Sequence, residues 1–367
     1  MKSCRPIFFM SILALTTCVD PVVPAYDYAT GFVLVEGDIV AGDNSSEVRL
    51  QRSVLSFGSY RLDPITDARV YCVAQDGAET EWLPGPVAGF YLPPEAFLPR
   101  PADTYFLRIQ LASGELIESQ PETVPAPGQF NNLRLTFDQE AYFSESRDRF
   151  VPAFTLLVDV EDTDPGDNFN LYTHQTWSQT SVCYTCRNSV YRNGRCVETP
   201  SSRLVDRYDY MCSEPCWVIS EGSTFRLGSD NLNPNATTAG LPVARIDFIG
   251  SGKLLAEVRQ QAITRRAYQY YEVLQNLTEG SSGLNAPLPA PLYGNLRDVS
   301  DLETTVLGYV GASSVVSQRL LWNRDSIDGE PLSRPPQPVL EPVSPAPPSA
   351  PCDGPNRTTV EPAGWNS

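Results

Sequence analysis

The feature that most constrains the fold is a series of short apolar or alternating runs that are separated by turn residues. The clearest early examples are residues 32–37, 47–50, 68–73, 89–92 and 104–109. Side chains on a strand alternate between its two faces, so runs of this length and period are typical of β-strands. Because turn residues recur between them, we expect a β-sandwich over residues 31–125.

A second β region follows, and we expect it to form another domain over residues 126–330. Its apolar runs continue through 154–160 and 169–177, and one helix is expected at 264–277 with Thr264 as a candidate N-cap. The helix has an apolar face made of Ile263, Ala267, Tyr270, Tyr271, Leu274 and Leu277. The predicted fold is mainly β, with two sandwich-like domains (immunoglobulin- or transthyretin-like), one amphipathic helix and a cysteine-rich loop insertion at 178–216.

The two ends of the chain have compositions unlike the middle. Residues 1–17 combine Lys2 and Arg5 with a short apolar run that ends before Cys18. This pattern predicts a lipoprotein signal peptide, with Cys18 carrying the lipid and 18–30 forming a tether. An ordinary secretory peptide is the alternative. The proline-dense segment 331–367 is expected to be an extended tail, either solvated or draped over the surface.

The charge of the chain excludes several classes of partner. The net charge is −17, and removal of residues 1–17 takes away Lys2 and Arg5 but no acid, which makes it −19. Such a chain repels nucleic acid, and it lacks a polybasic patch for anionic lipid. Membrane association would therefore depend on the lipid at Cys18. We expect a lipid-anchored protein at the cell surface or in the periplasm.

Cysteines are concentrated in one part of the chain. Removal of Cys4 and lipidation of Cys18 leave seven of the nine, so one thiol would be unpaired. Five of them lie close together: Cys183, Cys186, Cys196, Cys212 and Cys216. Their spacing resembles that of a four-thiolate zinc site, but in an oxidising compartment disulfides are the favoured interpretation. No cofactor is expected.

Several motifs, taken in order, resemble one family. They are residues 34–37, 67–70 with 76–77, 89–91, 258–264, 267–271, 291–296, 306–313 and the closing 358–365. In this order the chain resembles the Bacteroidota lipoprotein family called domain of unknown function 4249. The resemblance implies an outer-membrane, lipid-anchored protein on either the periplasmic or the extracellular face. It also implies an accessory role at a TonB-dependent outer-membrane receptor and no enzyme activity. The single late cysteine, Cys352, departs from the family's expected cysteine group and leaves the disulfide pattern open.

Catalytic and metal-binding patterns are weak in this sequence. The chain has one histidine, His174, and its alternating surroundings favour a structural role in a strand. An acidic stretch offers oxygen ligands that calcium prefers, from Asp159, Glu161, Asp162, Asp164 and Asp167. A strand-to-strand turn is the favoured alternative, because Asp and Gly residues stabilise turns and the EF-hand spacing is absent.

Aromatic residues around the cysteine cluster are the candidates for partner binding. They are Trp177, Tyr184, Tyr191, Tyr208, Tyr210 and Trp217. Such rings suit protein interfaces and sugar stacking, and they also suit cores. We expect residues 183–216 to face a partner. Two functions remain: a non-catalytic lipoprotein that binds a receptor or its ligand, and a surface adhesin or envelope scaffold that binds glycan or matrix polymer.

Overall fold

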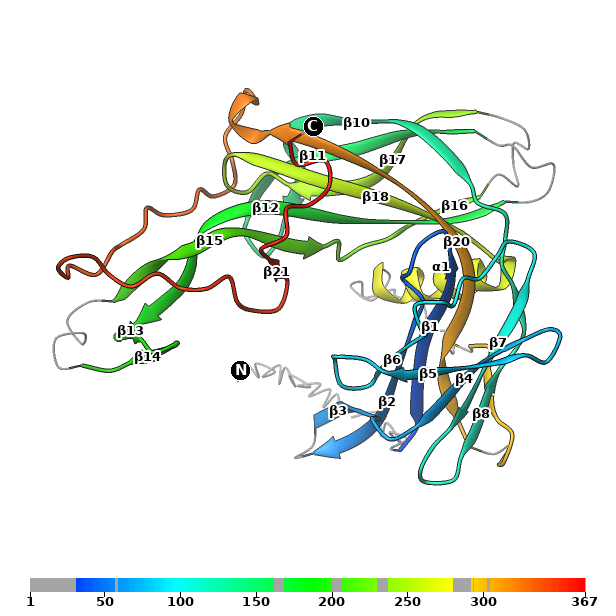
Figure 1. The fold of residues 1–367 in the computed structure, drawn as a ribbon. Helices are drawn as coiled ribbons and strands as arrows, with labels where there is room; N and C mark the ends of the chain where they lie inside the picture. Colours follow the sequence, from blue (N-terminus) through cyan, green and yellow to red (C-terminus); the bar gives the residue numbers. More distant parts are fainter. Residues whose placement is uncertain are drawn as a thin grey trace, which may run out of the picture.

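The structure is a computed structural model that describes residues 31–56, 59–161, 168–199, 206–229, 237–279, 292, 294–301 and 304–366. Strands form most of it, and α1 (Arg265–Glu279) is the one α-helix of these residues, so the mainly β prediction is confirmed. Figure 1 shows two β lobes that meet near α1, with an arm extending from the upper lobe. The expected signal peptide, Cys18 and the tether 18–30 lie outside the described residues.

The N-terminal lobe is a sheet folded over on itself. Its strands are β1 (Val33–Ala41), β2 (Glu47–Ser56), β3 (Ser59–Pro64), β4 (Arg69–Ala74), β5 (Glu79–Pro84), β6 (Phe90–Leu92), β7 (Thr104–Gln110), β8 (Leu116–Ser119) and β9 (Glu122–Thr123). Strand β5 pairs with β4 on one side and β6 on the other, which joins the two layers. Between the layers lie fully buried side chains such as Trp82, Tyr91 and Leu107.

Two late strands complete this lobe, so it is not made of residues 31–125 alone. The short strand β19 (Leu296–Asp298) pairs with β8, and β20 (Val306–Asn323) pairs in parallel with β1. Within β20, Gly308 has a φ of 102°, and a Cβ there would lie 1.9 Å from the carbonyl oxygen of Val35. Only glycine fits so close an approach between two backbones.

The second lobe is a sandwich of two sheets. One layer contains the second half of β20 with β18 (Lys253–Ile263), β12 (Phe169–Arg187), β15 (Arg207–Glu221) and β16 (Arg226–Ser229). The other layer is β10 (Gln129–Ser144), β11 (Arg149–Glu161) and β17 (Thr238–Asp247). Buried side chains from both layers, including Leu156, Val158, Tyr172 and Val258, fill the space between them.

Helix α1 lies on the outer face of the larger sheet. The hydroxyl of Thr264 accepts a hydrogen bond from the backbone N–H of Ala267 at 3.2 Å, which is the N-cap geometry expected from the sequence. The helix packs Ala267, Tyr268 and Tyr271 against the strands through contacts with Phe169 and Phe225. These contacts fix α1 between the two lobes (Figure 1).

The cysteine-rich segment is mostly strand, not the expected loop. Strands β12 and β15 continue outward as a paired ribbon, and β13 (Val190–Arg192) and β14 (Arg195–Val197) form a small hairpin at its end. We call this projection, residues 178–216, the arm. Its edge is lined by the proline-dense tail, in which β21 (Arg357–Thr358) pairs with β15 (Figure 1). The tail is therefore draped over the surface.

Three disulfides stabilise the arm. They are Cys183–Cys212, Cys186–Cys196 and Cys216–Cys352. The last one closes the longest loop, with a sequence separation of 136 residues. Beyond it, Trp365 packs edge-on against Trp217, with ring centroids 6.0 Å apart. Cys72 is free and buried in the N-terminal lobe.

Replacing Cys216 and Cys352 together by serine should loosen the tail. We expect the free energy of unfolding to fall by about 2–4 kcal/mol, because a cross-link over a long loop restricts the unfolded chain strongly. Urea unfolding of oxidised protein measures this, and limited proteolysis should show new cleavage in residues 335–350. The matched control replaces Cys186 and Cys196, which are 10 residues apart, and should cost less. Equal losses in both variants, with no new cleavage, would contradict the expectation.

Candidate functional site

A pocket of about 520 Å³ lies where the two lobes and α1 meet. We call it the junction pocket. Its walls come from β1 and β2 of the N-terminal lobe, from β12, β15 and β18 of the second lobe, and from α1. This volume lies within the range of about 300–1,000 Å³ that small-molecule sites occupy.

Strand alternation places charged side chains along this pocket. In β1, Val33 and Val35 are buried in the core, while Glu36 and Asp38 line the pocket. In β18, Val258 is buried in the second lobe, and its neighbour Arg259 lines the pocket. The remaining charged lining residues are Glu47, Arg49 and Glu221. The pocket therefore has carboxylates from both lobes.

Asp38 is the most perturbed of these carboxylates. Its Oδ2 accepts hydrogen bonds from the Ser313 hydroxyl at 2.7 Å and from the Gln261 amide at 3.1 Å. Its Oδ1 is buried and has no hydrogen-bond partner in the part of the chain described. Burial raises the pKa of Asp38 to about 7, although hydrogen bonds and the charge of Arg259 act in the opposite direction.

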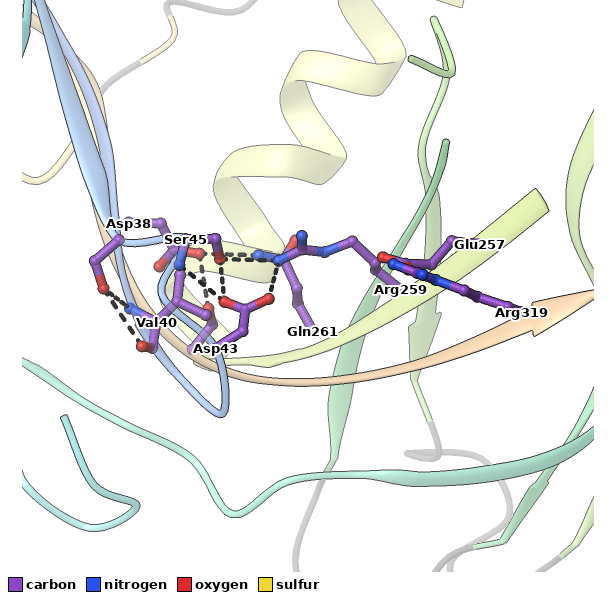
Figure 2. Close-up of polar contacts among 10 residues, drawn as sticks. Asp38, Val40, Asp43, Ser45, Glu257, Arg259, Gln261 and Arg319 are labelled. Atoms are coloured by element: carbon purple, nitrogen blue, oxygen red, sulfur yellow. Dashed lines mark hydrogen bonds and ion pairs between the residues drawn. The ribbon is translucent and has the colours of Figure 1, made fainter. Parts of the chain in front are cut away.

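Arg259 joins the two lobes next to Asp38. Figure 2 shows its side chain extending from β18 to the turn between β1 and β2. There Nη2 donates to the Asp43 carboxylate at 2.7 Å and to the Ser45 hydroxyl at 2.8 Å. Farther along the same sheet, Arg319 forms an ion pair with Glu257. These contacts fix the relative position of the strands that form the pocket.

Aromatic rings from α1 form another wall. Tyr270 stacks on Tyr309 with ring centroids 4.9 Å apart, and Tyr271 lies beside Tyr270. The Tyr309 hydroxyl donates a hydrogen bond to the Glu122 carboxylate at 2.7 Å, which fixes the orientation of the Tyr309 ring in the stacked pair. On the opposite side, the guanidinium of Arg49 lies 5.5 Å from the centre of the Phe90 ring. The pocket thus combines carboxylates with half-buried aromatic rings.

The structure places every cysteine of the cluster in a disulfide. Cys183, Cys186, Cys196, Cys212 and Cys216 are all bonded, with Cys352 as the sixth partner. Two of the three bridges form within the cluster. The sulfurs of Cys183, Cys216 and Cys352 lie within 4.8 Å of one another. Zinc binding requires thiolates, which these oxidised sulfurs do not supply.

The aromatic residues expected to contact a partner mostly lie inside the arm and the sandwich. Trp177, Tyr191, Tyr210 and Trp217 are buried. Tyr210 illustrates the reason: its hydroxyl bonds the Glu341 carboxylate of the tail at 2.8 Å. Tyr184 and Tyr208 are half-buried and keep part of their rings accessible. Of the six candidates, these two are the ones that offer surface to a partner.

The calcium candidates are only partly described. Asp159 accepts hydrogen bonds from Asn132, Arg134 and the backbone N–H of Gly240. Glu161 accepts one from Asn131 at 2.8 Å. The hydrogen bond from Asn132 is the main reason why the pKa of the Asp159 carboxyl is lowered. Asp162, Asp164 and Asp167 lie outside the described residues.

His174 lies in β12, and burial lowers its pKa, so it is neutral at pH 7. Its ring packs against Gly222, where a Cβ would lie 2.2 Å from a ring atom. Its Nδ1 has no hydrogen-bond partner among the described residues, so no carboxylate orients it as in a catalytic triad. This environment agrees with the structural role expected from the sequence.

Comparison with known families identifies the chain at the level of the family. The family model described as "Domain of unknown function (DUF4249)" matches residues 19–319. The chain belongs to this family. The DUF4249 match covers both lobes and the arm, and it ends before the disulfide-linked tail. No curated protein matches the chain. Within the described residues, no helix has both the length and the apolar character needed to cross a bilayer.

The sequence contains a signal for the junction pocket in the charged residues of two strands. Glu36 and Asp38 interrupt an otherwise apolar strand, and Arg259 follows the buried Val258 in β18. Charges within such runs mark a strand face that does not pack into a core. That the three residues share one pocket depends on the pairing of β20 with both β1 and β18, which the local pattern does not specify.

Replacing Asp38 by asparagine should change how stability depends on pH. The folded-state pKa of Asp38, about 7, lies above the ordinary value of 3.8, so the folded chain retains a proton that the unfolded chain releases. Stability therefore falls as pH rises from about 4 to about 7, and then levels off. Asparagine removes this loss while keeping an acceptor for Ser313.

The measurement is the free energy of unfolding in urea at about pH 4.5, 6 and 8. The difference between Asp38→Asn and the wild type should grow in favour of the variant across this series. Asp328→Asn, at an exposed position after β20, is the control for which a much smaller trend is expected. A difference that stays constant with pH would show that Asp38 titrates normally.

Proposed function

We propose that this DUF4249 chain is a non-catalytic, lipid-anchored binding protein at the outer membrane. It acts as an accessory to a TonB-dependent receptor and binds the receptor, its ligand or both. The observation that carries the proposal is the junction pocket, a polar cavity between two lobes that are joined by a shared strand. Ligand sites occur preferentially at such domain boundaries.

The arrangement of the pocket supports binding over catalysis. Its walls are held by the Arg259 contacts with Asp43 and Ser45 and by the stacked pair Tyr270–Tyr309. A pre-organised site loses little entropy when a ligand binds. The one histidine, His174, lines the pocket, but its Nδ1 has no hydrogen-bond partner among the described residues that would orient the ring for acid–base chemistry.

The arm supports a separate contact with the receptor. Three disulfides and the Glu341 hydrogen bonds restrict its conformations, so a partner need not order it on binding. Glu341 receives two hydrogen bonds from Arg192, at 2.9 and 2.6 Å. In this proposal the pocket holds the ligand and the arm contacts the receptor.

The membrane anchor is tested by the variant Cys18→Ala. We expect the wild-type chain to remain in washed membranes and the variant to be released, because each buried CH₂ of the lipid contributes about 0.8 kcal/mol. Immunoblotting of membrane and soluble fractions measures this. The control is the variant Cys72→Ala, which removes the free cysteine of the N-terminal lobe and should stay in the membranes. Retention of Cys18→Ala at the wild-type level would refute the lipid anchor.

The receptor partner is tested by purification of the tagged chain from detergent-solubilised outer membranes, followed by mass spectrometry. A co-purifying TonB-dependent receptor supports the proposal. Recovery of peptidoglycan or matrix polymer, without a receptor, would instead favour the adhesin or scaffold role.

The double variant Tyr184→Ala/Tyr208→Ala tests the contact through the arm. We expect it to reduce receptor recovery by about tenfold or more, because aromatic residues at an interface contribute about 2 kcal/mol or more when they are central. Phe143→Ala, which removes a ring that is 49% exposed on the β10–β11 hairpin, is the matched control. Equal recovery with both variants would show that the arm does not contact the receptor.

A further inference from the structure

The charges that line the junction pocket do not balance. Four carboxylates face two guanidinium groups across it: Glu36, Asp38, Glu47 and Glu221 against Arg49 and Arg259. Arg259 is already paired with Asp43, outside the pocket lining. The positive charge left for these four carboxylates is therefore mainly that of Arg49.

Three of the carboxylates form no ion pair within the described residues. Glu36, Glu47 and Glu221 are exposed, and none forms an ion pair with a lysine or arginine in the described part of the chain. Glu221 accepts a hydrogen bond from the neutral amide of Gln175. Burial of part of the Glu47 side chain raises the pKa of its carboxyl, and the charge of Arg49 opposes this rise.

Aromatic surface lies next to this negative charge. Burial, together with the charge of Glu36, raises the pKa of Tyr270 to about 12. The Tyr270 hydroxyl is therefore neutral at pH 7 and lies within electrostatic reach of Glu36. A cation placed between a carboxylate and the face of an aromatic ring is attracted by both.

The geometry does not favour a bare metal ion. Calcium and magnesium require several oxygens that converge within about 2.0–2.6 Å of the ion. Among the described residues, three potential metal-ligand atoms come close together only at the disulfide sulfurs of the arm, not at the pocket carboxylates. A volume of about 520 Å³ fits an organic group with its own substituents.

We propose that the junction pocket binds a short basic peptide, with a lysine or arginine side chain placed between the unpaired glutamates and the tyrosines of α1. This inference rests on the proposed function, since it names the class of ligand that the pocket holds. The net charge of −17 would draw such a peptide toward the protein from solution.

Isothermal titration with trilysine, on the full oxidised chain, tests the proposal, with triglutamate and triserine as reference peptides. We expect trilysine to bind and the reference peptides to bind at least about tenfold more weakly. Affinity for trilysine should fall as sodium chloride rises, because salt screens partly exposed charges.

Glutamine variants locate the site. Glu36→Gln, Glu47→Gln and Glu221→Gln should each weaken trilysine binding about two- to fivefold, as expected for partly exposed ion pairs. Glu81→Gln is the matched control, because Glu81 is exposed on β5 and does not line the pocket. Tyr270→Phe keeps the ring and should bind like the wild type, while Tyr270→Leu should bind more weakly.

Two results would overturn the inference: no preference for trilysine over the reference peptides, or binding that the three pocket variants and Glu81→Gln reduce equally. These outcomes are independent of the receptor experiment. A chain that co-purifies with its receptor but does not bind trilysine refutes only the ligand class. A chain that binds trilysine through the pocket but recovers no receptor refutes only the accessory role.

Discussion

The shared strand β20 is the constraint on which the rest of the structure depends. Its first half pairs in parallel with β1 through nine residue pairs, from Val33↔Val306 to Ala41↔Ser314. Its second half pairs antiparallel with β18 through eleven. Backbone hydrogen bonds thus continue without a break from one lobe to the other. A hinge at this point would have to break that ladder, so the pocket walls behave as parts of one body.

The arm depends on the tail and on its disulfides for stability. A two-stranded ribbon has too little apolar surface to be stable by itself. Here the disulfides, the buried ring of Tyr210 and the tail along the edge of β15 supply the missing contacts. The tail also covers part of an exposed strand edge, which would otherwise offer unpaired backbone groups to another chain. Proline suits this position because it follows the edge without needing a donor.

Much of the fold was predictable from local patterns, and the remainder depended on distant pairings. The strand runs, the Thr264 cap and the helix near 264–277 follow from residue periodicity and capping chemistry, which act over a few residues. The cysteine cluster predicted disulfides, but the pairing of Cys216 with Cys352 joins residues 136 apart in sequence. The range 31–125 omits part of the first lobe for the same reason. Strands β19 and β20, which come late in the chain, pair with β8 and β1 of that lobe.

The junction pocket was missed because its residues belong to segments that the sequence does not connect. Asp38 and Arg259 are each an ordinary charged residue within a strand, and only the double pairing of β20 brings them together. The arrangement also costs stability, because the raised pKa of Asp38 disfavours the folded state once its carboxyl has to ionise. Such costs are common where a surface is organised for a ligand that supplies the missing charge. The charge of Arg259 offsets only part of the rise in the Asp38 pKa, because its guanidinium forms an ion pair with Asp43 that joins the two lobes. The glutamates of the pocket are left facing the cavity.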